Sequence, residues 1–384
     1  MSDIITQGKT KVIKHTGLTH NGVLVVEFEL IGSSVMADGT GTIGPDRNSR
    51  LLIQRLIEQN DNIFTFLNGL GFQTTYVGKN ENGLYHEFCE PYLLEFVYRG
   101  AVCDGSSIIK REPEKYGATE GYEGCQLSTN RANRKFFNKD GSVLPFKKPI
   151  LETFHKKMLV EKADGAVDLI LESEAKKNPR YFKDGNQTQY AHEDPILVRR
   201  WPYAQDCWSI FNQKKPLNDN LLALINWQTG NLLSDCGRKI MRPMEKNEYV
   251  DAGTEKSLQN TTKEIMRAIN TAALITDFKK AEYNKVREVV FKEYIGGAFI
   301  IDGKCEYGLV TDKNGNQSIK LTDDMVSDNM RWAFDWQPAV SLKRMFQNYE
   351  SLEQKLLIAS MVAEGTKIWT DPKFIRNIKY ILGR

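Results

Sequence analysis

The chain has 384 residues, of which 41% are hydrophobic and 26% are charged. This composition is that of an ordinary globular protein, and the length allows two or three domains or lobes, each with a core of its own. The formal net charge is only +3, which argues against a broad nucleic-acid-binding surface and leaves local anion sites open.

Cysteine usage and hydropathy exclude further classes of protein. The six cysteines form no CxxC pair and there are only five histidines, so we expect neither a structural zinc site nor a disulfide framework. Residues 1–14 are polar and lack the apolar segment of a signal peptide. No stretch approaches about 20 consecutive apolar residues. We therefore expect a cytoplasmic protein without a membrane-spanning segment.

The first hundred residues predict antiparallel strands around one helix. Apolar, β-branched runs at 11–13 and 23–28 flank Asn21-Gly22, which is typical of a hairpin turn. In chain order, we then expect a glycine-rich loop at 32–47, a helix from Leu51, and strands at 72–76 and 92–98.

The rest of the chain predicts insertions, then helix, hairpin and helix. Residues 111–148 and 161–191 are polar with little periodicity, as in surface insertions. We predict a helix over 251–293, because Val286, Val289, Val290 and Tyr294 have helical spacing. The later segments are expected to be a strand at 298–301, a hairpin closed by Asn314-Gly315, a short strand at 318–321 and helix from Val340 to the C-terminus.

The strongest chemical signal is an acidic hairpin. Asp302, Lys304 and Glu306 alternate along a predicted strand, so they should share one face. Charges there are costly against a core but suit a phosphate and a hard cation. Across the turn, Asp323 and Asp324 follow the second strand, and Asp323 should come beside Glu306. Two carboxylates with phosphate oxygens and waters suit Mg²⁺. A solvated, salt-bridged hairpin is an equally good interpretation of the pattern alone.

Three other segments could bind anions. Lys9 and Lys11 alternate and could both meet a polyphosphate, although lysines also protect edge strands. Arg99 at a strand end, followed by Gly105-Ser106, could hold a phosphate, although a plain loop fits as well. Arg331 could supply a second guanidinium.

In this order, the motifs resemble the SAICAR synthetase family (phosphoribosylaminoimidazole-succinocarboxamide synthetase) of purine biosynthesis. The resemblance spans roughly residues 5–110 and 270–335. The matching elements are Gly8-Lys9-Thr10-Lys11, Asp38-Gly39, Arg99 with Gly105-Ser106, Lys156, His192-Glu193-Asp194-Pro195, Asp302 to Gly308, Asp323-Asp324 and Ser327 to Trp332.

The resemblance implies an α+β fold with two lobes. An N-terminal antiparallel sheet lobe, 1–92, would bind nucleotide. A larger α+β lobe, 93–384, would carry the acidic hairpin, with ATP in the cleft between them. This larger lobe would contain insertions near 111–148, 158–191 and 199–255.

The resemblance also implies an activity. An ATP- and Mg²⁺-dependent ligase would convert the carboxylate of a ribotide (CAIR) into an acyl phosphate and join it to aspartate. The resemblance assigns ATP binding to Lys9, Lys11, Lys156 and Glu306, and Mg²⁺ binding to Glu306 and Asp323. It assigns catalytic roles to Lys304, Asp302 and Asp324. It assigns substrate binding to Arg99, Ser106, Arg331, Asp38, His192, Asp194 and Asp328.

Several departures from the family pattern leave the substrates open. The turn after Arg99 is one residue longer and contains Cys103-Asp104, Glu193 interrupts the HDP turn, and Met330 replaces a serine. Three functions stay open: SAICAR synthetase, a ligase of the same fold with another carboxylate or amine, and a kinase-like phosphotransferase or non-catalytic nucleotide-binding protein. The expected partners are small molecules, with no nucleic acid or membrane, and a homo-oligomer is left open.

Overall fold

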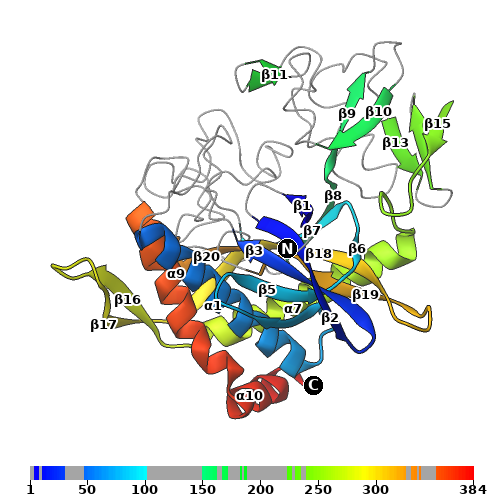
Figure 1. Ribbon diagram of the computed structural model, residues 1–384. Coiled ribbons are helices and arrows are strands. Elements are labelled where there is room, and N and C mark those ends of the chain that lie inside the picture. Colours follow the sequence, from blue (N-terminus) through cyan, green and yellow to red (C-terminus); the bar gives the residue numbers. More distant parts are fainter. Residues whose placement is uncertain are drawn as a thin grey trace.

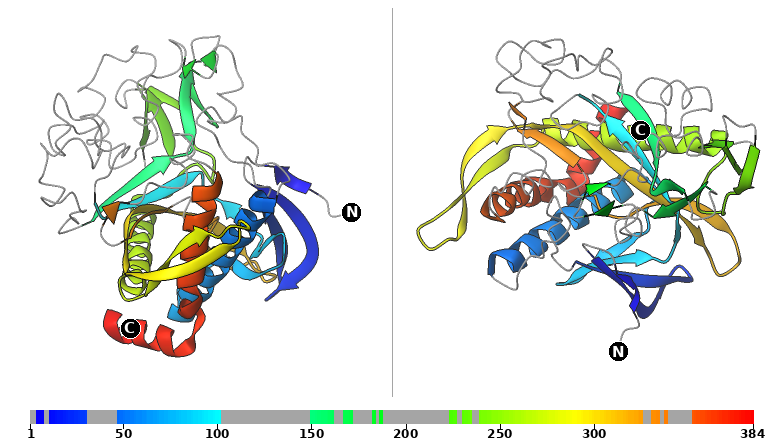
Figure 2. Two further views of the ribbon diagram at one scale, coloured as in Figure 1. Left: turned by 90° about the vertical axis from the view of Figure 1, so that its left-hand side faces the viewer. Right: turned by 90° about the horizontal axis from the view of Figure 1, so that it is seen from above.

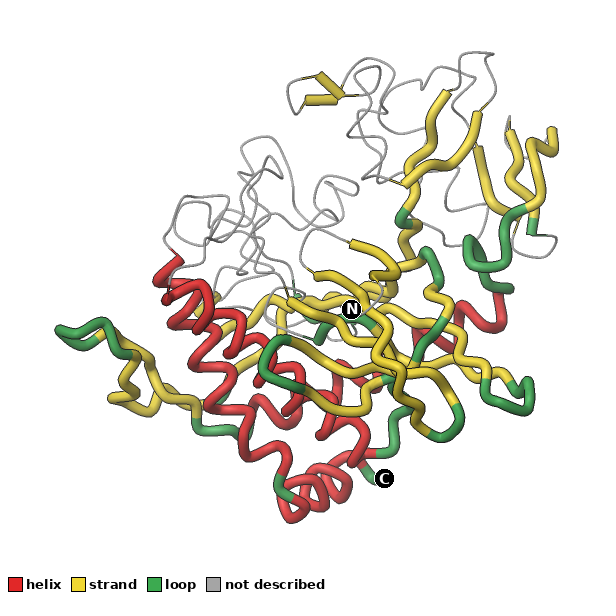
Figure 3. Tube along the Cα trace, in the orientation of Figure 1, coloured by secondary structure: helices red, strands yellow, loops and turns green. Residues whose placement is uncertain are grey.

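The computed structural model describes residues 4–7, 11–30, 47–101, 149–161, 167–171, 182–183, 186–187, 223–226, 230–234, 239–325, 330–334, 337–338 and 352–384. Helices and strands are mixed, and every pair of named strands is antiparallel. The predicted α+β class is therefore confirmed (Figures 1 and 3). Within these residues, no helix is both long and apolar enough to cross a membrane.

The N-terminal sheet has five strands in the order β1-β2-β3-β5-β4. Asn21 and Gly22 both have positive φ, 51° and 79°, as a two-residue hairpin turn between β2 and β3 requires. The predicted hairpin is thus confirmed. The strands are β1 (Ile4–Gln7), β2 (Lys11–His20), β3 (Val23–Leu30), β4 (Tyr76–Lys79) and β5 (Gly83–Glu87).

The second sheet is built on one long strand, β18 (Ala298–Thr311). Its first half pairs with β20 and β7, and its second half pairs with β19 and β6. Because side chains alternate along it, Cys305 and Tyr307 face helix α7 (Ala252–Leu274), where the Tyr307 hydroxyl contacts Thr262, while Lys304 and Glu306 face away from it. The other strands are β6 (Glu90–Pro91), β7 (Leu94–Arg99), β8 (Ile150–His155), β19 (Gln317–Thr322), β20 (Met330–Phe334) and β21 (Gln337–Pro338).

Four α-helices and a short 3₁₀ helix are described. α1 and α9 lie side by side (Figure 2), and Gln59 and Asn62 of α1 donate to the carbonyls of Ala359 and Ala363 at 2.8 and 3.1 Å. These buried amides fix the helix register, since their loss would leave polar groups unpaired in the core. The helices are α1 (Arg47–Leu70), α7 (Ala252–Leu274), α9 (Leu352–Thr366), η4 (Lys367–Thr370) and α10 (Pro372–Leu382).

Short strands occur in the regions predicted to be insertions. They form separate two- and three-stranded sheets, β9–β10, β11–β12 and β13–β14–β15. Their bounds are β9 (Lys157–Glu161), β10 (Val167–Leu171), β11 (Phe182–Lys183), β12 (Asn186–Gln187), β13 (Ala223–Asn226), β14 (Asn231–Ser234) and β15 (Lys239–Pro243). The lobe boundary at residue 92 stays a prediction.

The prediction of one helix over 251–293 is wrong in its second half. α7 ends at Leu274, and β16 (Phe278–Tyr283) and β17 (Val289–Gly296) form a projecting hairpin (Figure 1). The side chain of Asn284 accepts the backbone N–H groups of Val286 and Glu288 at 2.9 and 2.8 Å and closes the turn. The spacing of Val286, Val289, Val290 and Tyr294 fitted a helix over little more than two turns, and β-branched residues favour a strand once a turn is provided.

Glu255 in the first turn of α7 should make stability depend on pH. Burial, opposed by a hydrogen bond from Thr153, raises its pKa from 4.5 to about 7. The folded state then holds the proton more tightly, so this contribution is full below pH 4.5 and is lost as the pH rises through 7. At about 1.4 kcal/mol per pKa unit, we expect a loss of about 3 kcal/mol at most.

Urea unfolding at pH 5 and pH 8 measures this effect, with Glu255→Gln as the matched variant. The difference in unfolding free energy between wild type and variant should shift in favour of the variant as the pH rises. A difference that is the same at both pH values would contradict the prediction.

Candidate functional site

A cavity of about 610 Å³ lies between the two sheets, a size typical of small-molecule sites. The wall from the N-terminal sheet is largely apolar and includes Ile13, Val26 and Phe28. The opposite wall belongs to the second sheet and is charged. The polar lining residues of the cavity are Lys11 and Glu87 from the N-terminal sheet, and Lys156, Glu306, Thr322 and Asp323 from the opposite wall.

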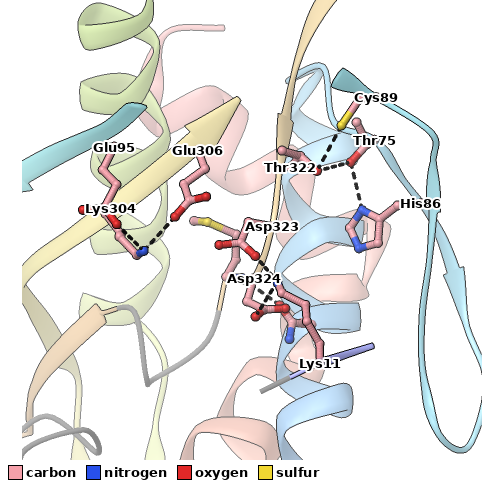
Figure 4. Close-up of polar contacts among 12 residues, drawn as sticks. Lys11, Thr75, His86, Cys89, Glu95, Lys304, Glu306, Thr322, Asp323 and Asp324 are labelled. Carbon is pink, nitrogen blue, oxygen red and sulfur yellow. Dashed lines mark hydrogen bonds and ion pairs between the residues drawn. The ribbon is translucent and has the colours of Figure 1, made fainter. Parts of the chain in front are cut away.

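The predicted alternation along β18 is confirmed. Asp302 and Lys304 pair across the strands with Arg99 and Val97, and Glu306 pairs with Thr322, so the three charges share the face away from α7. The Lys304 ammonium lies between two carboxylates, 3.0 Å from Glu95 and 2.7 Å from Glu306 (Figure 4).

Neighbouring charges keep Lys304 protonated and Glu306 ionised. Burial opposes the ammonium of Lys304, but the Glu95 and Glu306 carboxylates outweigh it and raise the pKa of Lys304. Burial likewise opposes the Glu306 carboxylate, but Lys304 and Lys156 hold its pKa below the usual value. Lys156 forms an ion pair with Glu306 directly. A buried, ionised carboxylate therefore stands at the cavity wall, with cations on both sides.

Asp323 and Asp324 come directly after β19 and face the same region. Asp323 has φ = 68°, which ends the strand and turns the chain. Lys11 of β2 forms ion pairs with both carboxylates, the one to Asp324 at 3.0 Å (Figure 4). Lys11 thus ties the N-terminal sheet to the acidic turn.

The donor set fits a magnesium ion bound together with a polyphosphate. Glu306 and Asp323 line the same cavity and offer the hard oxygen ligands that Mg²⁺ prefers. No cluster of three or more His, Cys, Asp or Glu that could hold a metal occurs among the described residues. Mg²⁺ is usually held by one or two carboxylates, with waters and substrate phosphates completing its octahedron.

The two predicted phosphate-binding arginines meet at Asp302. Arg331 donates Nε–H to Asp302 at 2.6 Å and makes a second bond to the same carboxylate, and Arg99 approaches it at 3.4 Å. Arg99 also donates to Glu152 at 2.5 Å and is only 5% exposed. Arg99 and Arg331 are thus brought together at one carboxylate. Their role toward a substrate phosphate stays a prediction.

Sequence reasoning missed Glu152. It stands in β8 within the otherwise largely apolar segment Ile150–His155 and is 2% exposed. A carboxylate in such a segment needs a buried cation, and that is the signal that could have found it.

Sequence reasoning also missed a group of buried polar side chains beside the acidic turn. Thr75, His86, Cys89 and Thr322 lie together in Figure 4, and the Thr75 hydroxyl is 2.8 Å from His86 Nδ1. The His86 ring stacks on Phe28 with centroids 4.4 Å apart. No local pattern marks these residues as a group.

Six predicted site residues lie outside the described residues, so their roles stay predictions. They are Lys9, Asp38, Ser106, His192, Asp194 and Asp328.

No family model matches the chain, and no curated protein matches it. It is similar to several solved structures. One is the phosphoribosylaminoimidazole-succinocarboxamide synthase of Ehrlichia chaffeensis, with 10% identity and a TM-score of 0.48 over 94% of this chain and 99% of that chain. Another is a SAICAR synthetase (type 2) in complex with ADP, with 15% identity and a TM-score of 0.45 over 91% and 93%. A third is the SAICAR synthase of Saccharomyces cerevisiae in complex with SAICAR, with 11% identity and a TM-score of 0.39 over 100% and 95%.

Proposed function

We propose that the protein is an ATP- and Mg²⁺-dependent ligase of the SAICAR synthetase kind. It would join the carboxylate of CAIR to the amine of aspartate through an acyl phosphate, in purine nucleotide biosynthesis. One observation carries the proposal. A single cavity combines the apolar residues of the N-terminal sheet with Lys11 of the same sheet and with Lys156, Glu306 and Asp323 of the opposite wall. The identity of the two substrates rests on the motifs that resemble the family.

The two sides of the cavity suit the two halves of a nucleotide. Ile13, Val26 and Phe28 offer apolar surface to a planar base. Lys11 and Lys156 reach the cavity from opposite sheets, where their ammonium groups can bind phosphate oxygens as point charges. Mg²⁺, when bound by Glu306 and Asp323, would neutralise phosphate charge and hold the phosphates in line.

The chemistry needs positioning more than covalent help from the protein. An oxygen of the substrate carboxylate attacks the γ-phosphorus of ATP, and ADP leaves. The amine then attacks the acyl carbon, the bond from that carbon to the phosphate oxygen breaks, and phosphate and the amine's proton are released. Orientation and charge neutralisation supply most of the acceleration in such phosphoryl transfers. Lys304 does not itself line the cavity; it is held between Glu95 and Glu306 and would act by orienting Glu306.

Product analysis with the purified protein tests this function. With ATP, Mg²⁺, CAIR and aspartate, a ligase yields ADP, phosphate and the amide in equal amounts. With hydroxylamine in place of aspartate, the acyl phosphate should be trapped as a hydroxamate. A phosphotransferase would instead leave a stable phosphorylated acceptor and no hydroxamate. ADP binding without turnover of CAIR would indicate a ligase for another carboxylate or a non-catalytic binding protein.

A further inference from the structure

Thr322 is a cavity-lining hydroxyl to which the proposed function gives no role. It is the last residue of β19, directly before Asp323 and paired across the sheet with Glu306. Its residue is 4% exposed, yet it lines the cavity. Two donors point at its oxygen: the Thr75 hydroxyl at 3.1 Å and the Cys89 thiol at 3.6 Å (Figure 4).

His86 determines the direction of these hydrogen bonds. It is fully buried, and burial, with Lys11 as the second cause, lowers its pKa to about 3, so the ring is neutral and carries one N–H. No hydrogen-bond partner for its Nε2 lies among the described residues. A buried N–H without a partner is rarer than an acceptor without one. The proton therefore belongs on Nδ1, which donates to Thr75 at 2.8 Å.

The proton on His86 Nδ1 then limits the hydrogen bonds that the Thr75 hydroxyl can make. Its oxygen accepts from His86, so its own proton is free to point at Thr322 Oγ1 at 3.1 Å or at the Leu321 carbonyl at 3.3 Å. The backbone holds this geometry, because Thr75 N–H donates to the Leu321 carbonyl at 2.9 Å and Leu321 N–H donates to the Gln73 carbonyl at 3.0 Å. Thr75 thus stays beside the end of β19.

The proton of Thr322 is left for a ligand. Among the described residues, the groups close enough to accept it are Thr75 Oγ1, which already accepts from His86, and the sulfur of Cys89, which is a weak acceptor and must then turn its own proton elsewhere. The hydroxyl stands next to Asp323 and Glu306, where the lysines attract an anion. An ionised phosphate oxygen is a much stronger acceptor than a thiol sulfur.

We propose that Thr322 Oγ1 donates a hydrogen bond to a phosphate oxygen of the nucleotide in the cavity, and that His86 and Thr75 fix the direction of its proton. The inference rests on the proposed function only in taking a nucleotide as the ligand. Thr322 is then a binding residue for phosphate, while Thr75 and His86 are positioning residues.

Calorimetric titration of Thr322→Val with ADP and with adenosine tests the proposal. Valine keeps the shape of threonine and removes the hydroxyl. A hydrogen bond to a charged group contributes about 1.5–3 kcal/mol, so the Kd for ADP should rise about 10-fold or more. Adenosine has no phosphate, and its Kd should stay within about twofold of wild type. Titrations without Mg²⁺ keep the effect separate from the metal carboxylates.

Matched variants complete the test. Thr322→Ser keeps the hydroxyl and should bind ADP as wild type does. Thr75→Val removes the donor to Thr322 and should weaken ADP binding by a smaller factor, while Thr75→Ser should not. Thr322→Ala carries the same expectation as Thr322→Val if the valine variant does not fold.

The outcomes separate this inference from the proposed function. Wild-type protein that binds ADP, with Thr322→Val and Thr322→Ala binding it equally well, would overturn the inference alone. Equal weakening of ADP and adenosine binding would also overturn it, because that is a purely structural effect. Wild-type protein that binds neither ADP nor pyrophosphate would overturn both.

Discussion

Replacement of Glu306 by glutamine should lower amide formation at least about 100-fold. Glu306 is 5% exposed and lines the cavity together with Asp323. Glutamine keeps the size of the side chain and removes the charge that would bind Mg²⁺. Metal charge stabilises such transition states by several kcal/mol, and about 1.4 kcal/mol corresponds to a factor of ten in rate. Steady-state turnover with ATP, CAIR and aspartate measures the loss.

Glu95→Gln is the matched control for this variant. Glu95 shares the partner Lys304 with Glu306 but is not one of the residues that line the cavity. Its replacement should cost less activity and should leave the Mg²⁺ enhancement of ADP affinity in place, whereas Glu306→Gln should abolish that enhancement. Turnover by Glu306→Gln near the wild-type rate would show that Glu306 is not a metal ligand.

Replacement of Arg99 by methionine should destabilise the fold by about 3–5 kcal/mol. Arg99 is 5% exposed and its guanidinium binds Glu152 at 2.5 Å and Asp302 at 3.4 Å. Asp302 keeps Arg331 as a partner, but the variant removes the guanidinium that binds Glu152, which is 2% exposed. Removing one member of a buried ion pair takes a close opposite charge away from the other member in the interior, at about this cost. Urea unfolding of the two proteins measures it.

The double variant Arg99→Met/Glu152→Leu provides the control. Replacing both members of a buried ion pair by apolar residues of similar volume is often close to neutral. The double variant should therefore recover most of the stability that the single variant loses, with a coupling energy of about 2 kcal/mol or more in the cycle. If the two losses simply add, the Arg99–Glu152 pair does not contribute as the structure indicates.

The sequence by itself determined the features that depend on local periodicity. Asn21-Gly22 predicted a hairpin because few residues other than Asn and Gly accept two successive positive φ angles. The alternation of Asp302, Lys304 and Glu306 predicted a charged strand face, because side chains alternate with a period of two in any strand. The same reasoning, applied over little more than two turns, mistook the hairpin at 278–296 for helix. Four residues are too few to separate a helical period from two adjacent strand faces.

Only the tertiary structure decided which charges meet. Lys11 and Asp323 are 312 residues apart in the chain, and Thr75 and Thr322 are 247 apart. Such pairs depend on how the N-terminal sheet packs against β18 and β19, a property of the whole core and not of any segment. The acidic hairpin was visible in the sequence, but its cations, the buried Glu152 and the hydroxyls that orient toward the cavity came from that packing. The physical reason is that burial gives each charge a specific partner, whereas local sequence fixes only the face on which the charge lies.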